Sequence, residues 1–189
     1  MAIENRNLGP NVFESKLGGI TVTGRAHGFS AWFVLALRLM MGVAFLNAGL
    51  DKLLGGGFSA YGYLAHAVPE NGGPLVDQFL WIAGTPAALA FIDVAVPFGQ
   101  LAIGLGLIIG AAVRLAAFFG ATMMATFYLA NWDVAHGLIN GDFAYMLVFL
   151  AVAAFGAGRI LGLDAYIENY EIDGQSLVDR YPKLEYVLG

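Results

Sequence analysis

The apolar stretch from Ala31 to Leu54 constrains the fold of this chain more than any other feature. A bilayer core about 30 Å thick is crossed by about 20 helical residues, and this stretch is long enough and apolar enough to do so. The composition agrees, because 59% of the residues are hydrophobic and 12% are charged, whereas soluble domains have about 25% charged residues. The chain is therefore predicted to be an integral membrane protein.

Three more stretches have the length and apolar character of membrane helices. Together with the first they give spans at about 31–54, 86–110, 113–131 and 143–160. The 26 glycines fit helices that approach closely, since lipid supplies no hydrophobic drive for helix association and small residues permit tight packing. We expect an all-α fold, an integral membrane four-helix bundle that occupies residues 29–162.

The segments outside these spans are more polar. Phe58 to Thr85 is too long for a simple connection and shows helical periodicity, so we expect a structured outer loop on the membrane surface between spans 1 and 2. Residues 1–28 are predicted to be a polar N-terminal tail without the apolar core of a signal peptide. Residues 163–189 are predicted to be an acidic C-terminal tail.

Lysine and arginine residues predict the orientation of the chain, because cytoplasmic loops carry an excess of them. They gather on one side of the bundle: Arg6, Lys16 and Arg25 before span 1, Arg114 between spans 2 and 3, and Arg159, Arg180 and Lys183 after span 4. The other two loops have only Lys52, at a helix edge. Both termini are therefore predicted to be cytoplasmic, in a multi-pass protein of the cell (plasma) membrane.

The sequence excludes several kinds of site. His27, His66 and His136 all lie outside the spans, so no pair can hold a haem between facing helices. No flavin or dinucleotide fingerprint and no spacing of metal ligands is present, so no metal site is predicted. The absence of cysteine excludes thiol exchange. Nothing indicates nucleic acid, and membrane lipid is the expected surrounding.

Charged and imidazole side chains are expected to meet at the outer end of the bundle. Lys52 leans down from the outer end of span 1 and Asp93 leans up from within span 2, because helical side chains lean toward the N-terminus and the two spans run in opposite directions. This pair is either a site or a structural ion pair, and the sequence leaves both open. With His66 and His136 it forms the predicted catalytic group, an outer mouth suited to a small anion.

Other polar residues lie at membrane depth, where they are costly and are candidates for function. Tyr128, Asn131 and Trp132, at the outer end of span 3, are expected to face a flat apolar molecule in the bilayer. The remaining intramembrane polar residues are Arg38, Asn47 and Gln100. Arg38 is interpreted either as an arginine that snorkels to the inner interface or as a catalytic residue, and we expect it to matter for assembly.

Three motifs resemble the DoxX/DoxD family of four-span membrane proteins. LRLMMGVAFLNAGLDKL, Leu37 to Leu53, resembles the opening helix of that family. GLGLIIGAAVRLAA, Gly104 to Ala117, is similar to its glycine-rich second span, and GAGRILGLD, Gly156 to Asp164, is similar to its closing signature. Where many members carry a glutamate before the second motif, this chain has Gln100.

The resemblance implies a function. Some DoxD members resemble the small membrane subunit of a thiosulfate:quinone oxidoreductase, in which thiosulfate is oxidised to tetrathionate and electrons pass to a membrane quinone. It implies a quinone as cofactor, beside Tyr128, Asn131 and Trp132, and a quinone-dependent oxidoreductase of the thiosulfate dehydrogenase type, acting on thiosulfate or a similar small sulfur anion.

An alternative function stays open, because many DoxX members have no established activity. In that alternative the chain is a non-catalytic membrane subunit that docks or stabilises a partner redox or respiratory enzyme. A partner subunit or a homo-oligomer is expected. A small transporter is disfavoured, since the sequence shows no convincing internal repeat or broken helix.

Overall fold

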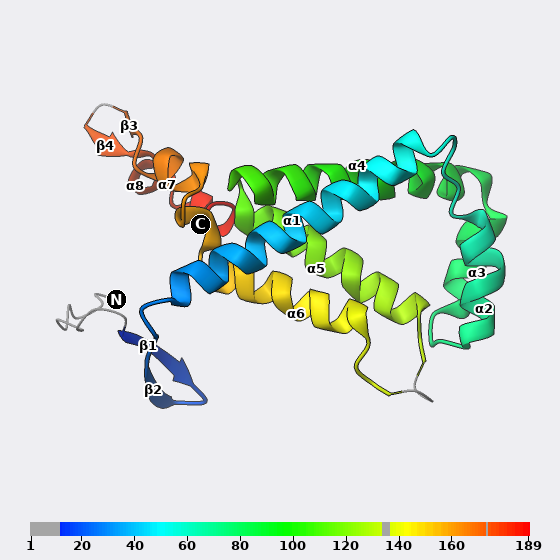
Figure 1. Cartoon of the computed structure of the whole chain (residues 1–189), viewed down its shortest axis with the longest axis horizontal. Coiled ribbons are helices and arrows are strands. Elements are labelled where there is room, and N and C mark those ends of the chain that lie inside the picture. Colours follow the sequence, from blue (N-terminus) through cyan, green and yellow to red (C-terminus); the bar gives the residue numbers. More distant parts are fainter. Residues whose placement is uncertain (1–11, 134–136, 173) are drawn as a thin grey trace.

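Four long helices form the body of the protein (Figure 1). The computed structural model describes residues 12–133, 137–172 and 174–189. The long helices are α1 (Ser30–Leu54), α4 (Pro86–Ile109), α5 (Val113–Ala130) and α6 (Gly141–Ala154). Helix α1 packs along α4, α5 packs along α6, and the α4–α5 and α1–α6 contacts close the four into a bundle. The prediction of an all-α membrane four-helix bundle is confirmed.

The core of the bundle is apolar and draws on all four helices. Met41 and Phe45 of α1 meet Leu107 of α4, and Phe149 of α6 lies in the same cluster, all with less than a tenth of their surface exposed. The rings of Phe45 and Phe149 pack edge to face, with their centroids 4.8 Å apart. Large apolar side chains also cover the outside of the helices, as lipid requires of a membrane protein.

The fourth span is shorter than predicted. Among the described residues, α1, α4 and α5 are long and apolar enough to cross a membrane, whereas α6 has 14 residues and a length of about 21 Å. The prediction of a helix over 143–160 is wrong at its end, because the helix stops at Ala154. Gly156 then takes a left-handed conformation with φ of 60°, and a 3₁₀ turn follows over Ala157–Arg159.

Glycines allow α1 and α4 to touch through their backbones. A Cβ atom placed on Gly104 would lie 2.5 Å from the backbone nitrogen of Leu46, and one on Gly49 would lie 2.9 Å from the backbone nitrogen of Leu101. Neither contact can be relieved by moving a flexible side chain. The glycine abundance seen in the sequence therefore has the predicted role, because it permits close packing without a hydrophobic drive.

The connection between α1 and α4 folds into a helical cap over one end of the bundle (Figure 1). It contains a π-helix (Tyr63–Ala67), α2 (Val68–Asn71) and α3 (Val76–Gly84). Its apolar residues, among them Leu64, Val68 and Phe79, pack together and against Ala130 at the end of α5. The outer loop expected between spans 1 and 2 is therefore a small packed layer with a core of its own.

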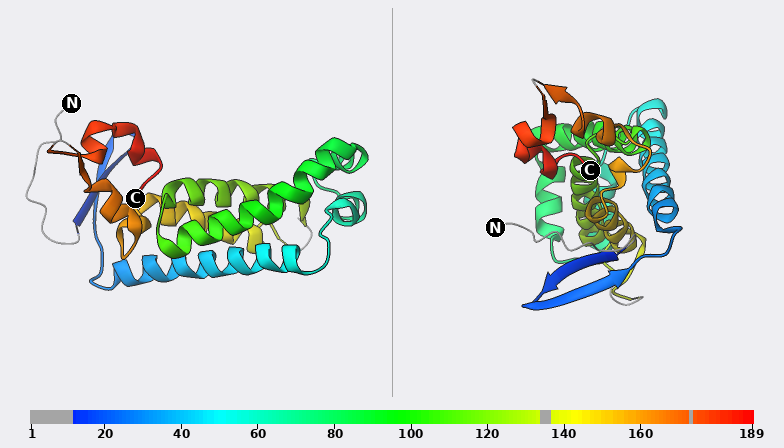
Figure 2. Two further views of the ribbon diagram at one scale, coloured as in Figure 1. Left: turned by 90° about the horizontal axis from the view of Figure 1, so that it is seen from above. Right: turned by 90° about the vertical axis from the view of Figure 1, so that its left-hand side faces the viewer.

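Two small units lie at the other end of the bundle (Figures 1 and 2). One is an antiparallel hairpin of β1 (Val12–Leu17) and β2 (Ile20–Arg25). The sequence predicted only a polar tail over these residues. The Gly18–Gly19 pair has positive φ at both residues, as a two-residue hairpin turn needs. The other unit follows the bundle and contains α7 (Leu163–Glu168), β3 (Glu171–Ile172), β4 (Gln175–Ser176), α8 (Leu177–Arg180) and a 3₁₀ turn (Pro182–Tyr186).

Replacing Gly104 with alanine should loosen the bundle. The added methyl group meets the backbone of α1, so the helices must separate, and we expect a loss of about 1 to 3 kcal/mol of folding free energy. Gly84→Ala is the matched control, because a Cβ atom there meets no heavy atom within 4 Å. Thermal unfolding in detergent measures the stability of both variants. Equal unfolding midpoints for the two variants would contradict the packing described for α1 and α4.

Candidate functional site

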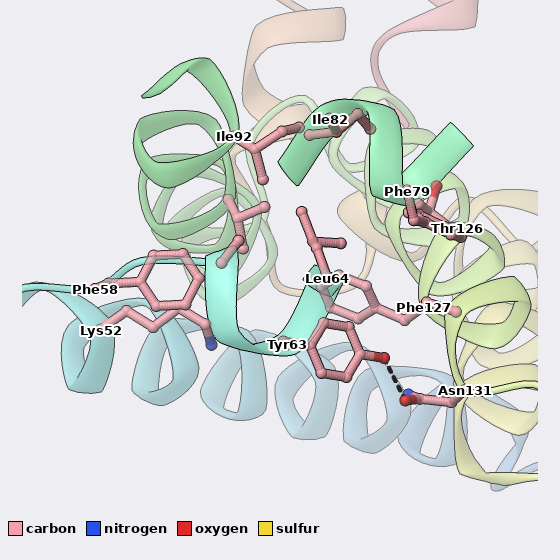
Figure 3. Close-up of a pocket in the computed structure, with 13 residues that line it drawn as sticks. Lys52, Phe58, Tyr63, Leu64, Phe79, Ile82, Ile92, Thr126, Phe127 and Asn131 are labelled. Atoms are coloured by element: carbon pink, nitrogen blue, oxygen red, sulfur yellow. Dashed lines mark hydrogen bonds between the residues drawn. The ribbon is translucent and has the colours of Figure 1, made fainter. Parts of the chain in front are cut away.

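An apolar cavity of about 300 Å³ lies between the helical cap and the adjacent ends of α1, α4 and α5 (Figure 3). Its walls are mostly aliphatic and aromatic side chains, including Leu64, Phe79, Ile82, Ile92, Val96 and Phe127. Thr126 also lines it, but its hydroxyl donates to the Thr122 carbonyl within α5. Lys52, Tyr63 and Asn131 supply the other polar side chains of the wall.

Lys52 is held at the cavity by the way α1 ends. Its ammonium Nζ donates to the Ala48 carbonyl at 3.3 Å, in the last turn of the helix, where a cation is favoured by the helix dipole. After Leu54 the chain turns through glycines and returns, so that the Phe58 ring lies 5.6 Å from Nζ. The aromatic face stabilises the cation in a partly apolar place.

Asp93 does not pair with Lys52. Its Oδ1 accepts from the backbone N–H of Ala60 at 2.6 Å, at the start of the helical cap. Within the described residues no salt bridge joins Asp93 and Lys52, so the ion pair considered from the sequence is not formed. The reason is that the cap brings its own unpaired N–H groups to Asp93, and a carboxylate binds such groups at the start of a helix.

A chain of hydrogen bonds runs from the cavity wall to α6. The Tyr63 hydroxyl donates to Oδ1 of Asn131, and Nδ2 of Asn131 donates to Oδ2 of Asp142 at 2.7 Å. Asp142 stands in the first turn of α6, and Asn140 caps that helix by accepting from the Phe143 N–H at 3.0 Å. Burial raises the pKa of the Tyr63 hydroxyl, and the Asp142 carboxylate raises it further. Tyr63 is therefore a neutral phenol at physiological pH.

The predicted outer mouth is only partly assembled. His66 is exposed and its ring meets the edge of Tyr61, with centroids 6.2 Å apart, so it does not line the cavity. His136 lies outside the described residues. Of the predicted catalytic group, Lys52 lines the cavity, and Asp93 binds the cap beside it.

The predicted cofactor-binding group divides in the same way. Asn131 lines the cavity, while the Tyr128 hydroxyl donates to the Leu138 carbonyl and its ring packs against Trp132 at 5.6 Å. Sequence reasoning missed Tyr63 and Asp142. The available signal was a polar residue at each end of the segment between spans 3 and 4, namely Asn131 and Asp142. Nothing in the spacing indicated that Asn131 would connect Asp142 to Tyr63.

A second buried polar cluster closes the end of the bundle away from the cap. Arg38 of α1 is 1% exposed, and its guanidinium donates from Nη1 to the carbonyls of Ala157 at 2.5 Å and Ile160 at 2.9 Å. Its Nη2 donates to the Leu161 carbonyl at 3.3 Å. Arg38 therefore binds carbonyls of the turn that follows α6, and because its side chain is buried, its interpretation as a snorkelling side chain is wrong.

Asp164 completes this inner cluster. It is fully buried and accepts from the backbone N–H groups of Ala112 at 2.7 Å and Val113 at 2.9 Å, at the first turn of α5. Its Oδ2 also accepts from the N–H of Gly189 at 3.1 Å. Arg38 and Asp164 attract each other electrostatically. The cluster thus joins α1, α5 and the segment after α6.

A comparison with protein families now identifies the chain. The model of the DoxX family matches residues 33–132, which is more than half of the sequence. The chain belongs to the DoxX family. All the residues that line the cavity fall inside the matched region, whereas Asp142 and Asp164 fall outside it. The comparisons with curated proteins and with solved structures find no match.

The remaining intramembrane polar residues of this DoxX protein lie in contrasting places. Gln100 of α4 is 3% exposed, and among the described residues its Oε1 has no hydrogen-bond partner. Asn47 is exposed on the outward face of α1, and no hydrogen bond joins its side chain to another described residue. Exposed threonines on α5, by contrast, bond back to their own helix. Asn47 therefore has an exposed amide without a partner among the residues that the structure describes.

Replacing Arg38 should destabilise the protein far more than replacing a surface arginine. Arg38→Gln removes the guanidinium that holds the buried and partly buried carbonyls of the turn after α6, and we expect a loss of about 3 kcal/mol or more. Arg159→Gln is the control, because Arg159 pairs with Glu168 at 2.7 Å while 45% exposed, and such pairs contribute about 0 to 1 kcal/mol. Membrane abundance and thermal unfolding measure the effects of both substitutions. Normal abundance and stability of Arg38→Gln would contradict the structural role.

Proposed function

We propose that this DoxX protein binds a membrane quinone in the outer cavity and serves the quinone-linked oxidation of thiosulfate or a similar small sulfur anion. The observation that carries the proposal is the cavity itself. It is about 300 Å³ in volume, has apolar walls and lies at the outer ends of the spanning helices. Sites of this kind bind flat apolar ligands and orient them with a few polar groups.

The residues of the cavity fit a quinone head group. Its flat ring matches the aromatic and aliphatic walls, and its two ring oxygens need polar partners at separate places. Figure 3 shows Lys52 and the hydrogen-bonded Tyr63–Asn131 pair beside these apolar walls. Lys52 would donate to one oxygen, Tyr63 would meet the other, and the apolar walls would exclude water. When bound, a quinone accepts two electrons and two protons and becomes a quinol.

The sulfur anion is proposed from the family resemblance and from the position of Lys52. Two thiosulfate anions that join as tetrathionate would release two electrons, and these electrons with two protons from water would reduce one quinone to the quinol. Lys52 is the cation of the cavity wall, in the last turn of α1. An anion held there forms a charge-assisted hydrogen bond, which is about twice as strong as a neutral one.

A second candidate function is docking of a partner redox or respiratory enzyme, and Asn47 favours it. An amide exposed to lipid is costly, and in membranes such groups usually hydrogen-bond across to a neighbouring helix. The bundle supplies no such helix opposite the outward face of α1, so a helix of another chain would satisfy it. In this candidate the cavity is a lipid-filled space and the chain is non-catalytic.

We also propose that both termini are cytoplasmic and that the cavity opens at the outer face of the plasma membrane. The excess of lysine and arginine at the inner end of the helices supports this orientation. Arg38 and Asp164 would then lie near the cytoplasm, and Lys52 and Asn131 near the outer surface.

Lys52→Met should weaken ligand binding without loss of protein. Methionine keeps much of the apolar stem but removes the charge, so affinity for thiosulfate or quinone should fall about ten- to a hundredfold. Because Lys52 forms no salt bridge with Asp93, the variant should accumulate normally. Lys183→Met, exposed in the C-terminal unit, is the control. The measurements are decylubiquinone binding to purified protein and thiosulfate-dependent quinone reduction in native membranes.

These measurements separate the two functions. Unchanged binding and turnover in Lys52→Met would remove the cavity as the redox site. Two results together would establish the docking function instead. Wild-type protein would catalyse no thiosulfate-dependent quinone reduction beside its native partners, and Asn47→Leu would lose a co-purifying chain.

Labelling of single cysteines tests the orientation. The natural chain has no cysteine, so Ser59→Cys in the helical cap and Gln175→Cys in the C-terminal unit each give one thiol at an exposed residue. On intact cells an impermeant maleimide should label the first and spare the second, and both should react after lysis. Labelling of Gln175→Cys alone on intact cells would reverse the proposed orientation.

A further inference from the structure

The β1–β2 hairpin has one apolar face and one polar face. Ile20 and Val22 of β2 lie on the same face, because successive side chains of a strand point to opposite sides. Thr21 and Thr23 lie on the other face, and the register adds Lys16 of β1, which pairs with Thr21. All five side chains are exposed, Ile20 by 70% and Val22 by 44%. The hairpin therefore presents an open apolar face.

The rest of the protein does not cover this face. Among the described elements, none packs extensively against the hairpin. The apolar clusters of the bundle and of the helical cap include none of its described residues. A two-stranded hairpin is marginally stable in water unless its apolar face packs against something. We therefore expect Ile20 and Val22 to be covered by a surface outside the described chain.

The hairpin is tied closely to the start of a membrane span. Residues 26–29 form the whole connection from β2 to α1, and a connection of this length reaches less than about 20 Å. Hydrogen bonds fix its bend: the Ser30 N–H donates to the His27 carbonyl at 2.9 Å, and the Phe29 N–H donates to Nδ1 of His27 at 3.3 Å. The hairpin is thus held near the level at which α1 begins.

The direction of the strands matches the plane of a bilayer. Figure 2 shows the hairpin beside the start of α1, with its strands running across the direction of the long helices rather than along it. Helices that cross a membrane stand roughly upright in it. Strands that run across them therefore lie roughly parallel to the membrane surface.

Aromatic side chains mark this level as a membrane–water interface. Phe29, Trp32 and Phe33, in the connection and at the start of α1, each expose more than half of their surface. Tryptophan is enriched at the level of the lipid head groups, where its ring has both apolar and polar surroundings. The hairpin directly precedes these residues, so lipid is the surface nearest to its apolar face.

We propose that the β1–β2 hairpin binds the bilayer surface, with Ile20 and Val22 inserted between the lipid head groups and Thr21, Thr23 and Lys16 facing the water. The partner is the lipid surface around α1 itself. Binding of this kind grows with the apolar area that leaves water. The hairpin would then act as a lateral anchor for the first span.

Apolar burial, rather than charge, drives this binding. Residues 12–25 contain one acidic residue, Glu14, and two basic residues, Lys16 and Arg25, so their net charge of +1 gives little attraction to anionic lipids. A bilayer of neutral lipid should therefore suffice. The inference is independent of the proposed quinone function and of which side of the membrane the hairpin occupies. The hairpin also precedes the region that matches the family, which begins at residue 33.

A fluorescent probe on each face of one strand tests the proposal. The chain has no cysteine, so Val22→Cys and its matched control Thr23→Cys each carry a single NBD label on the purified full chain. Phosphatidylcholine nanodiscs leave both sides of the bilayer open to buffer. The probe at residue 22 should show blue-shifted emission and be quenched by doxyl-labelled lipid. The probe at residue 23 should emit as in water and be quenched by iodide.

A substitution on the apolar face should release the hairpin. Ile20→Ala removes three apolar carbons, and the ratio of bound to released hairpin should fall about tenfold or more. The probe at residue 22 would then lose lipid quenching and gain iodide quenching. Thr21→Ala is the control, because it also replaces a β-branched residue of the strand but on the polar face. It should leave both kinds of quenching unchanged.

The quenching pattern decides the outcome. Iodide quenching as strong at residue 22 as at residue 23 would place the apolar face in water and overturn the proposal. Protection of residue 22 from both iodide and lipid would overturn it too, because a second copy of the chain would then cover the face. Should the label at residue 22 disturb the hairpin, Ile20→Cys provides a second position on the same face. Water-like emission with iodide quenching there would likewise contradict lipid binding.

Discussion

The burial of Arg38 against backbone carbonyls is the interaction on which the inner half of this structure depends. Lipid offers no hydrogen bonds, so every carbonyl that a short helix leaves free must find a donor in the protein. Helix α6 ends after 14 residues, and the guanidinium of Arg38 binds the carbonyls of the turn that follows. Asp164 completes the arrangement by binding the first N–H groups of α5. Arg38 and Asp164 together thus hold the segment after the short fourth helix against α1 and α5.

The outer half of the bundle is organised by a different constraint, the backbone contact of α1 with α4. Gly49 and Gly104 allow these helices to touch, and the cap that connects them folds back over the end of α5. The cap supplies its own apolar core and leaves a cavity beneath it. Tight packing in one place and an open space in another therefore come from the same pair of helices.

The polar groups of the cavity are few, and each is held by a neighbour. Lys52 lies against Phe58 and the end of its own helix, and Tyr63 is tied through Asn131 to Asp142. Their polar atoms are thus engaged with protein partners, and the surface of the cavity itself is almost wholly apolar. Through Asn131, the start of α6 is tied to the helical cap, although the two segments lie far apart in the sequence.

The sequence by itself determined the membrane class, the positions of α1, α4 and α5, and the family, because long apolar runs and glycine spacing are local properties. It indicated Lys52 and Asn131 as residues of an outer site for the same reason. Only the tertiary structure decided the partners. Asp93 binds the cap instead of Lys52, and Tyr63 and Asp142 meet through Asn131, because a polar side chain in a bundle takes whichever donor or acceptor the packing brings nearest. That choice depends on contacts between distant segments, which no spacing along the chain encodes.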